Sequence, residues 1–191
     1  HAFKLKSRKH LLLALIASLA FAADMSAWHW SLQFTSVANS TILVNTAPIY
    51  MVLFASFVFK ESISKQFLLS FALTYIGVIG LIYFSSTKSD GALLGDGLAL
   101  IAAFLYATYL LIISRLGDES SINIIFYTTL FTCMFGMLFA LFESREFLPS
   151  SASQFYNLLA MAIFCQVGGQ FFITYSLPKI TASFGSIGLL M

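Results

Sequence analysis

The chain has 191 residues, of which 59% are apolar and only 9% are charged. A soluble domain carries about 25% charged residues, so this composition excludes a water-soluble enzyme, a nucleic-acid-binding domain and a disordered segment. The net charge of +2 is too small to indicate a polyanionic partner. Cys133 and Cys165 lie in separate apolar runs without a Cys-x-x-Cys motif or a His cluster, so no disulfide framework, metal site or cofactor is predicted.

Short charged clusters divide the chain into apolar blocks of about 18–24 residues, the length of a membrane-spanning helix. The approximate blocks are 11–34, 41–59, 67–84, 97–114, 122–142 and 155–177, and a seventh begins near 180. The alternating segments of about 10 residues that mark a membrane β-barrel do not occur in the sequence. The sequence therefore predicts an all-α polytopic membrane protein, a bundle of transmembrane helices.

The first block contains Asp24, the only charged residue inside a predicted span. An ionised Asp at the centre of a bilayer costs about 2.5–3.5 kcal/mol, so it normally faces water or a polar partner. Asp24 either binds a cation or proton on a transport path, or is a structural carboxyl near the interface. Trp28 shares its helix face and either stacks on a substrate or joins Trp30 in the outer aromatic belt. His29 lies off this face, as an interfacial residue.

Residues 1–23 also resemble a secretory signal peptide, with a basic start, an apolar run and small residues at its end. The apolar stretch, however, continues past Asp24 to Phe34. A transmembrane helix is therefore favoured over a cleaved signal.

Five polar residues lie close together around the start of the second block: Asn39, Ser40, Thr41, Asn45 and Thr46. Pro48 lacks an N–H and should free a backbone carbonyl near Val44. Such breaks often bind substrates in transporters, so Asn45 and Pro48 are candidates for the substrate path. The alternatives are a helix cap at Asn39 to Thr41, which is favoured for Asn39, and ordinary interhelical hydrogen bonds.

Later blocks add further candidates. Tyr106 and Tyr109 share one face of 97–114 and either line a cavity or pack between helices. Gln166 and Gln170 are four residues apart, so both amides face one direction, either toward a substrate or toward a neighbouring helix. Together with the first two blocks, these give the predicted substrate or ion pathway: Asp24, Trp28, Asn45, Pro48, Tyr106, Gln166 and Gln170.

The basic residues predict the orientation, because cytoplasmic loops are enriched in Lys and Arg. Alternate loops place eight basic residues on one side of the membrane and two, Lys88 and Arg145, on the other. The eight are Lys4, Lys6, Arg8, Lys9, Lys60, Lys65, Arg115 and Lys179. We expect this side to be cytoplasmic, in a multi-pass protein of the cell membrane, such as a bacterial inner membrane.

A weak internal repeat appears when the chain is shifted so that Ser31-Leu32 aligns with Ser176-Leu177. The two stretches end spans that run in opposite directions, a mark of inverted-repeat transporters. The offset predicts ten helices in the whole protein. Residues 1–85 would be the last three helices of the first repeat. Residues 92–191 would be the first three helices and the start of the fourth of the second, so the chain is expected to be a middle section.

Several stretches together resemble EamA-type members of the drug/metabolite transporter superfamily. Residues 36–48, followed by Lys60-Glu61, resemble the fourth helix of that family, and residues 77–81 the fifth. Gly95-Asp96-Gly97 with Tyr106 resembles the sixth helix, and residues 173–183 the turn between the eighth and ninth. The resemblance implies ten helices and export or exchange of small metabolites.

The leading hypothesis is a secondary transporter that works by alternating access in a lipid bilayer. Its solute would be a small organic metabolite, such as an amino acid, a nucleoside-like compound or a drug, with possible proton or solute counter-exchange. An integral membrane enzyme is the alternative, but His1, His10 and His29 form no catalytic cluster. A channel or a non-transporting bundle is a third possibility; filter motifs and a nucleotide-binding loop are not found in the sequence.

Overall fold

The computed structural model describes residues 5–60, 65–84, 92–141, 149 and 151–179, and these contain helices and no strand. The helices are α1 (Arg8–Ser31), α2 (Val37–Val44), α3 (Ala47–Phe59), α4 (Lys65–Phe84), α5 (Ala92–Ser114), α6 (Ser121–Leu141), α7 (Ala152–Met161) and α8 (Gln170–Ser176). A π-helical segment η1 (Ala162–Gly169) joins α7 to α8, and a 3-10 turn η2 (Leu177–Lys179) follows α8.

Within these residues, five helical segments are long and apolar enough to cross a membrane: Arg8–Ser31, Val37–Val58, Ala92–Ser114, Ser121–Leu141 and Ala152–Lys179. They match five of the predicted blocks. The remaining block, 67–84, lies within α4, whose apolar stretch is Leu68–Gly77. The predicted all-α membrane bundle is confirmed, and the block predicted near 180 lies outside the described residues.

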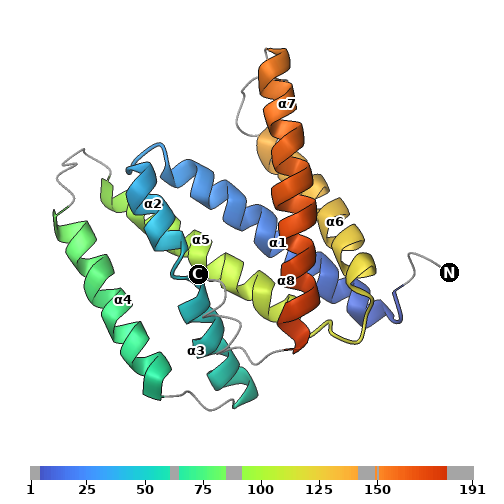
Figure 1. Cartoon of the computed structure of the whole chain (residues 1–191), viewed down its shortest axis with the longest axis horizontal. Helices are drawn as coiled ribbons and strands as arrows, with labels where there is room; N and C mark the ends of the chain where they lie inside the picture. The colour runs from blue at the N-terminus through green and yellow to red at the C-terminus, as the bar shows by residue number, and fades with distance from the viewer. Residues whose placement is uncertain (1–4, 61–64, 85–91, 142–148, 150, 180–191) are drawn as a thin grey trace.

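The core of the bundle lies between α1 and α5, which run side by side through its centre (Figure 1). One flank carries α6 and the α7–α8 column, and the other carries α2, α3 and α4. Ala17 and Ala20 of α1 share one buried cluster with Ala103 and Ala107 of α5. These small side chains let the two backbones approach closely, which is how helices associate where apolar burial provides little driving force.

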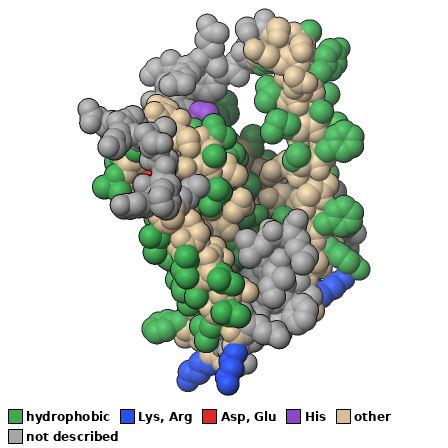
Figure 2. Space-filling view, turned by 60° about the vertical axis from the view of Figure 1, so that its left-hand side comes forward, with side chains coloured by type: hydrophobic (Ala, Val, Ile, Leu, Met, Phe, Trp, Pro, Cys, Tyr) green, Lys and Arg blue, Asp and Glu red, His purple; other side chains and the backbone are tan. Residues whose placement is uncertain are grey.

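The outer surface of the bundle is apolar, as lipid contact requires. Figure 2 shows hydrophobic side chains over its sides and the visible Lys and Arg side chains gathered at one end. Arg115 and Lys179 line one hollow together with Glu119, which contacts Lys6. Basic residues from the segment before the first span and from two predicted loops thus lie around one hollow, and the end of the bundle that carries it is called the basic end.

The span made of α2 and α3 is broken at Asn45 and Thr46. Pro48 occupies the first turn of α3, where its missing N–H is harmless. The Thr46 hydroxyl donates to the Leu43 carbonyl at 2.6 Å, which satisfies a group at the end of α2. The predicted break is present.

The predicted cap of this span is wrong. Ser36 caps α2, since its hydroxyl accepts from the Asn39 N–H at 3.1 Å and its backbone is extended. Asn39 to Thr41 lie inside the helix. The helix therefore starts at Val37, before the predicted boundary of 41.

Asp96 requires a second correction, because it lies inside α5 rather than before the predicted span. The residue is 6% exposed, and its Oδ1 accepts from the Thr35 hydroxyl at 2.7 Å. Asp24 is therefore not the only acid within a span. Hydropathy alone does not register the hydrogen bond from Thr35 that satisfies this carboxyl group inside the helix.

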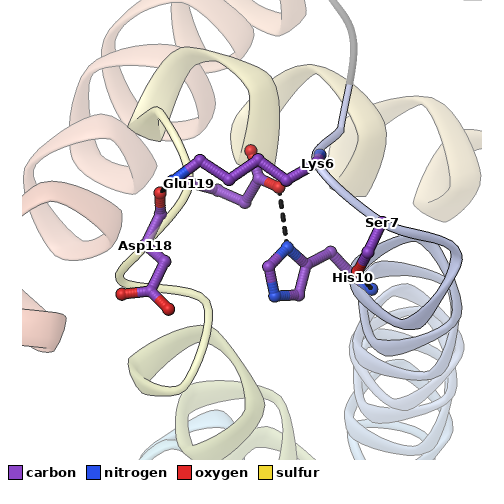
Figure 3. Close-up of polar contacts among 5 residues, drawn as sticks. All are labelled: Lys6, Ser7, His10, Asp118 and Glu119. Carbon is purple, nitrogen blue, oxygen red and sulfur yellow. Dashed lines mark hydrogen bonds and ion pairs between the residues drawn. The ribbon is translucent and has the colours of Figure 1, made fainter.

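The start of α1 is tied to the loop between α5 and α6 by Glu119 (Figure 3). The Glu119 Oε1 accepts from the Lys6 backbone N–H at 2.6 Å and lies 2.7 Å from the His10 Nδ1, while the Lys6 ammonium donates to the Asp118 carbonyl. The Glu119 side chain is 2% exposed. Burial raises the pKa of Glu119, but the Lys6 and His10 contacts outweigh it and hold the pKa below its ordinary value of 4.5.

This junction should make stability sensitive to acid. The folded protein binds a proton at Glu119 less readily than the unfolded chain does. The stabilisation is therefore complete above pH 4.5 and is lost as the pH falls through the lowered pKa. Glu119→Gln should cost about 1–3 kcal/mol at pH 7 and reduce the loss of stability between pH 5 and 3. Thermal unfolding measures the stability at pH 7 and its loss between pH 5 and 3. An equal loss of stability in the wild type and in Glu119→Gln would contradict this role of Glu119.

Candidate functional site

A cavity of about 330 Å³ lies between α1, α2, α5 and the η1–α8 segment. Ligand sites in proteins have volumes of about 300–1,000 Å³, so it is large enough for a small organic molecule. Six of the seven residues predicted for the substrate pathway line it: Asp24, Trp28, Asn45, Tyr106, Gln166 and Gln170. The seventh, Pro48, is buried in α3.

Local helix geometry explains why these side chains converge. Asp24 and Trp28 are one turn apart on α1, and Gln166 and Gln170 are likewise one turn apart where η1 meets α8. Asn45 sits at the break that Pro48 helps to create. The π-helical turns of η1 alter the helical register around Gln166, and such turns are frequent at functional sites.

Asp24 is the only charged residue among the described residues that line the cavity. It is 4% exposed, and no described residue forms a hydrogen bond or an ion pair with its carboxyl group. Asp96, by contrast, has the Thr35 hydroxyl as a partner. The Asp96 carboxyl group thus has a hydrogen-bond partner. The Asp24 carboxyl group faces the cavity without a partner among the described residues.

Aromatic rings form the wall of the cavity next to Asp24. Phe21 stacks on Tyr109 with ring centres 4.8 Å apart and lies 6.1 Å from the Tyr106 ring. The Tyr106 and Tyr109 rings are themselves stacked at 6.0 Å, so both tyrosines lie on one face of α5 as the spacing predicts. Trp28 completes the aromatic lining, and its indole N–H is buried with no acceptor among the described residues.

His29 and Trp30 belong to a different surface. They line a hollow of about 320 Å³ between α1 and α6, with Thr132 and Gly136 on the opposite side. This agrees with the prediction that His29 lies off the Asp24 face. The two tryptophans of the chain therefore have different surroundings, because only Trp28 lines the central cavity.

Five further residues line the central cavity but were not predicted as site residues: Phe21, Met25, Thr41, Val44 and Cys165. Phe21 precedes Asp24 by three residues, so helical spacing could have placed it on the same face. Cys165 depends on the π-helical register of η1, for which the sequence holds no comparable signal.

A second cavity, of about 670 Å³, opens at the basic end of the bundle and is lined by Arg115, Glu119 and Lys179, among others. One face of α8 connects the two cavities, since Gln170 lines the central one and Thr174, one turn later, lines the second. Between them lies Tyr109, 3% exposed, whose hydroxyl donates to the Gln170 Oε1 at 3.0 Å.

Among the residues that the structure describes, no group of three or more His, Cys, Asp and Glu side chains could hold a metal ion. What the cavity offers is one carboxyl, three amides and several aromatic faces, a set suited to binding an organic molecule.

The model of the EamA-like transporter family matches two segments of the chain, residues 2–83 and 93–190. The chain belongs to the EamA-like transporter family. The first matched segment contains α1 to α3 and nearly all of α4, and the second contains nearly all of α5 and continues past α8. The central cavity is therefore lined from both EamA segments, with α1 and α2 in one and α5, η1 and α8 in the other.

Curated relatives come from all three domains of life. The chain is 30% identical to the uncharacterized transporter YetK of Bacillus subtilis, over 62% of this chain and 37% of the relative. It is 32% identical to an uncharacterized vacuolar membrane protein of Saccharomyces cerevisiae, over 57% and 32%. It is 27% identical to an uncharacterized transporter of Archaeoglobus fulgidus, over 86% and 57%. The chain thus spans about a third to just over half of these relatives, and no solved structure matches it.

Proposed function

We propose that this chain belongs to a secondary transporter that carries a small organic metabolite across a membrane as an exporter or exchanger. The observation that supports the proposal most strongly is the central cavity lined from both EamA segments. In inverted-repeat transporters the substrate lies near the bilayer midplane at the interface between the repeats. A polar, aromatic cavity inside an apolar bundle is otherwise costly to maintain.

In this proposal the two segments supply the middle helices of a ten-helix transporter. Residues 1–85 contribute the last three helices of the first repeat, and residues 92–191 open the second. The protein lies in a cell membrane, such as a bacterial inner membrane. The basic end of the bundle faces the cytoplasm. Asp24 binds either the solute or a proton that is exchanged for it.

Alternating access requires a closed barrier on one side of the cavity at a time. We propose that Tyr109 and Gln170 form the barrier toward the basic end, because their hydrogen bond lies between the two cavities. Opening would separate the two side chains and join the central cavity to the second one.

Tyr109→Phe should weaken this barrier. The substitution keeps the ring stacking but removes the 3.0 Å hydrogen bond to Gln170, which is worth about 1 kcal/mol, or about a fivefold shift in the open population. A membrane-impermeant thiol reagent applied from the basic end should then label Cys165, which lines the central cavity, about fivefold faster. Tyr106→Phe is the matched control, since no described residue bonds the Tyr106 hydroxyl. Equal labelling in both variants would remove Tyr109 from the barrier.

Solute flux tests the proposed function directly. The full-length protein is reconstituted in liposomes loaded with an unlabelled metabolite mixture, and uptake of individual labelled metabolites is measured. A transporter should give saturable uptake that the internal solutes accelerate by exchange. Uptake no greater than in protein-free liposomes for every metabolite would contradict the proposal. Turnover of lipids or metabolites by the protein would instead indicate a membrane enzyme.

A further inference from the structure

The described lining of the central cavity carries negative charge and no positive charge. Among the described residues that line it there is one acid, Asp24, and there is no Lys, Arg or His. Asp24 is only 4% exposed, and its carboxyl group has no hydrogen-bond or ion-pair partner among the described residues. A buried carboxylate needs a compensating charge or proton, and the cavity is the place from which one can come.

The rest of the lining suits an organic cation better than a metal ion. Phe21, Trp28 and Tyr106 present aromatic rings close to Asp24, and ring faces attract ammonium groups within about 6 Å. Hard divalent cations such as Ca²⁺ bind more tightly as the number of charged ligands rises, and the described lining of this cavity offers a single carboxylate. An anionic solute would meet an acid and no basic side chain among the described lining residues.

The amide side chains lie on the other walls of the cavity, on α2 and on the η1–α8 segment. Asn45, Gln166 and Gln170 can orient the polar groups of a solute without adding charge. The volume of about 330 Å³ leaves room for a body of one aromatic ring or a short aliphatic chain.

We propose that the solute carries a single positive charge, on an amino or quaternary ammonium group attached to a small apolar body, and that Asp24 binds that charge. The proposal rests on the proposed transport function and narrows its substrate class. Phe21, Trp28 and Tyr106 surround the ammonium group, and the three amides orient the rest of the molecule.

Four probes of similar size separate charge from shape. The cations are 2-phenylethylamine and phenyltrimethylammonium, the neutral analogue is 2-phenylethanol, and the anion is phenylacetate. Binding of each labelled probe to the purified full-length protein is measured directly, and the exchange of each is measured in liposomes. At least one cation should bind and exchange, with about 10- to 100-fold higher affinity than the neutral and anionic probes, the ratio expected for a hydrogen-bonded charge pair.

Variants assign the preference to Asp24. Asp24→Asn should reduce the preference for the cation over 2-phenylethanol to less than about threefold, and Asp24→Glu should keep most of it. Asp96→Asn is the matched control, because Asp96 already has a protein partner and does not line the cavity. An unchanged preference in Asp24→Asn, equal binding of all four probes, or binding of neither cation would overturn the proposal. Exchange of neutral or anionic metabolites in the same liposomes would show that the transport function stands while the cation assignment fails.

Discussion

Asp24→Asn is expected to lower the rate of solute exchange by about 10- to 100-fold, while Asp96→Asn leaves the rate within about threefold. Both acids are buried within spans, at 4% and 6% exposure. Only Asp24 lines the cavity, however, and only Asp96 has a hydrogen-bond partner among the described residues, the Thr35 hydroxyl. An amide at position 96 can still accept that bond through its oxygen, whereas an amide at position 24 removes the only charge among the described lining residues.

Initial rates in liposomes test this pair of substitutions at matched protein density. Thermal unfolding in detergent should be similar for both variants, so that a change in rate is not a change in folding. Equal losses in the two variants, or a fully active Asp24→Asn protein, would show that the carboxyl at position 24 has no role beyond structure.

Gly95→Ala is expected to destabilise the fold by about 1–3 kcal/mol. A Cβ atom at position 95 would lie 2.7 Å from the Thr35 backbone nitrogen and 2.9 Å from the Phe34 Cβ. Backbone atoms cannot rotate away as the tip of a side chain can, so α5 and the turn after α1 would have to separate. The separation would also stretch the bond between Thr35 and Asp96.

Gly97→Ala is the matched control, because it lies two residues further along the same helix and a Cβ there meets nothing within 4 Å. Alanine has a higher helix propensity than glycine by about 1 kcal/mol, so this variant should be as stable as the wild type or slightly more stable. Thermal unfolding of the two variants in detergent measures the difference. Equal stabilities would show that the contact between α5 and the turn adjusts without cost.

The membrane spans could be predicted from sequence because apolar length is a local property. Each predicted block corresponds to a helix wherever the structure describes it. The predicted helix boundaries were wrong where polar side chains lie inside a helix. The Asp96 carboxyl group accepts a hydrogen bond from the Thr35 hydroxyl, so α5 begins before this charge rather than after it. Ser36 likewise caps α2 ahead of the polar residues that the sequence suggested.

The site could be predicted in part for a similar reason. Helical spacing alone puts Asp24 and Trp28 on one face, and Gln166 and Gln170 on another. These faces meet around one cavity because of tertiary packing, namely the close approach of α1 and α5 through their alanines. The contact between His10 and Glu119 joins residues 109 positions apart, and no local pattern in the sequence indicates it.

Labelling of Cys165 tests most directly whether the central cavity is the solute path. Cys165 lines the cavity, and Cys133, the other cysteine of the chain, does not. In the full-length protein with every other cysteine replaced by serine, a membrane-impermeant thiol reagent should reach Cys165 through water. A transported solute should slow this labelling at concentrations that saturate its exchange, and Asp24→Asn should weaken the protection by about 10-fold or more. Labelling that saturating solute leaves unchanged, or a Cys165 that is unreactive from both sides of the membrane, would contradict the account.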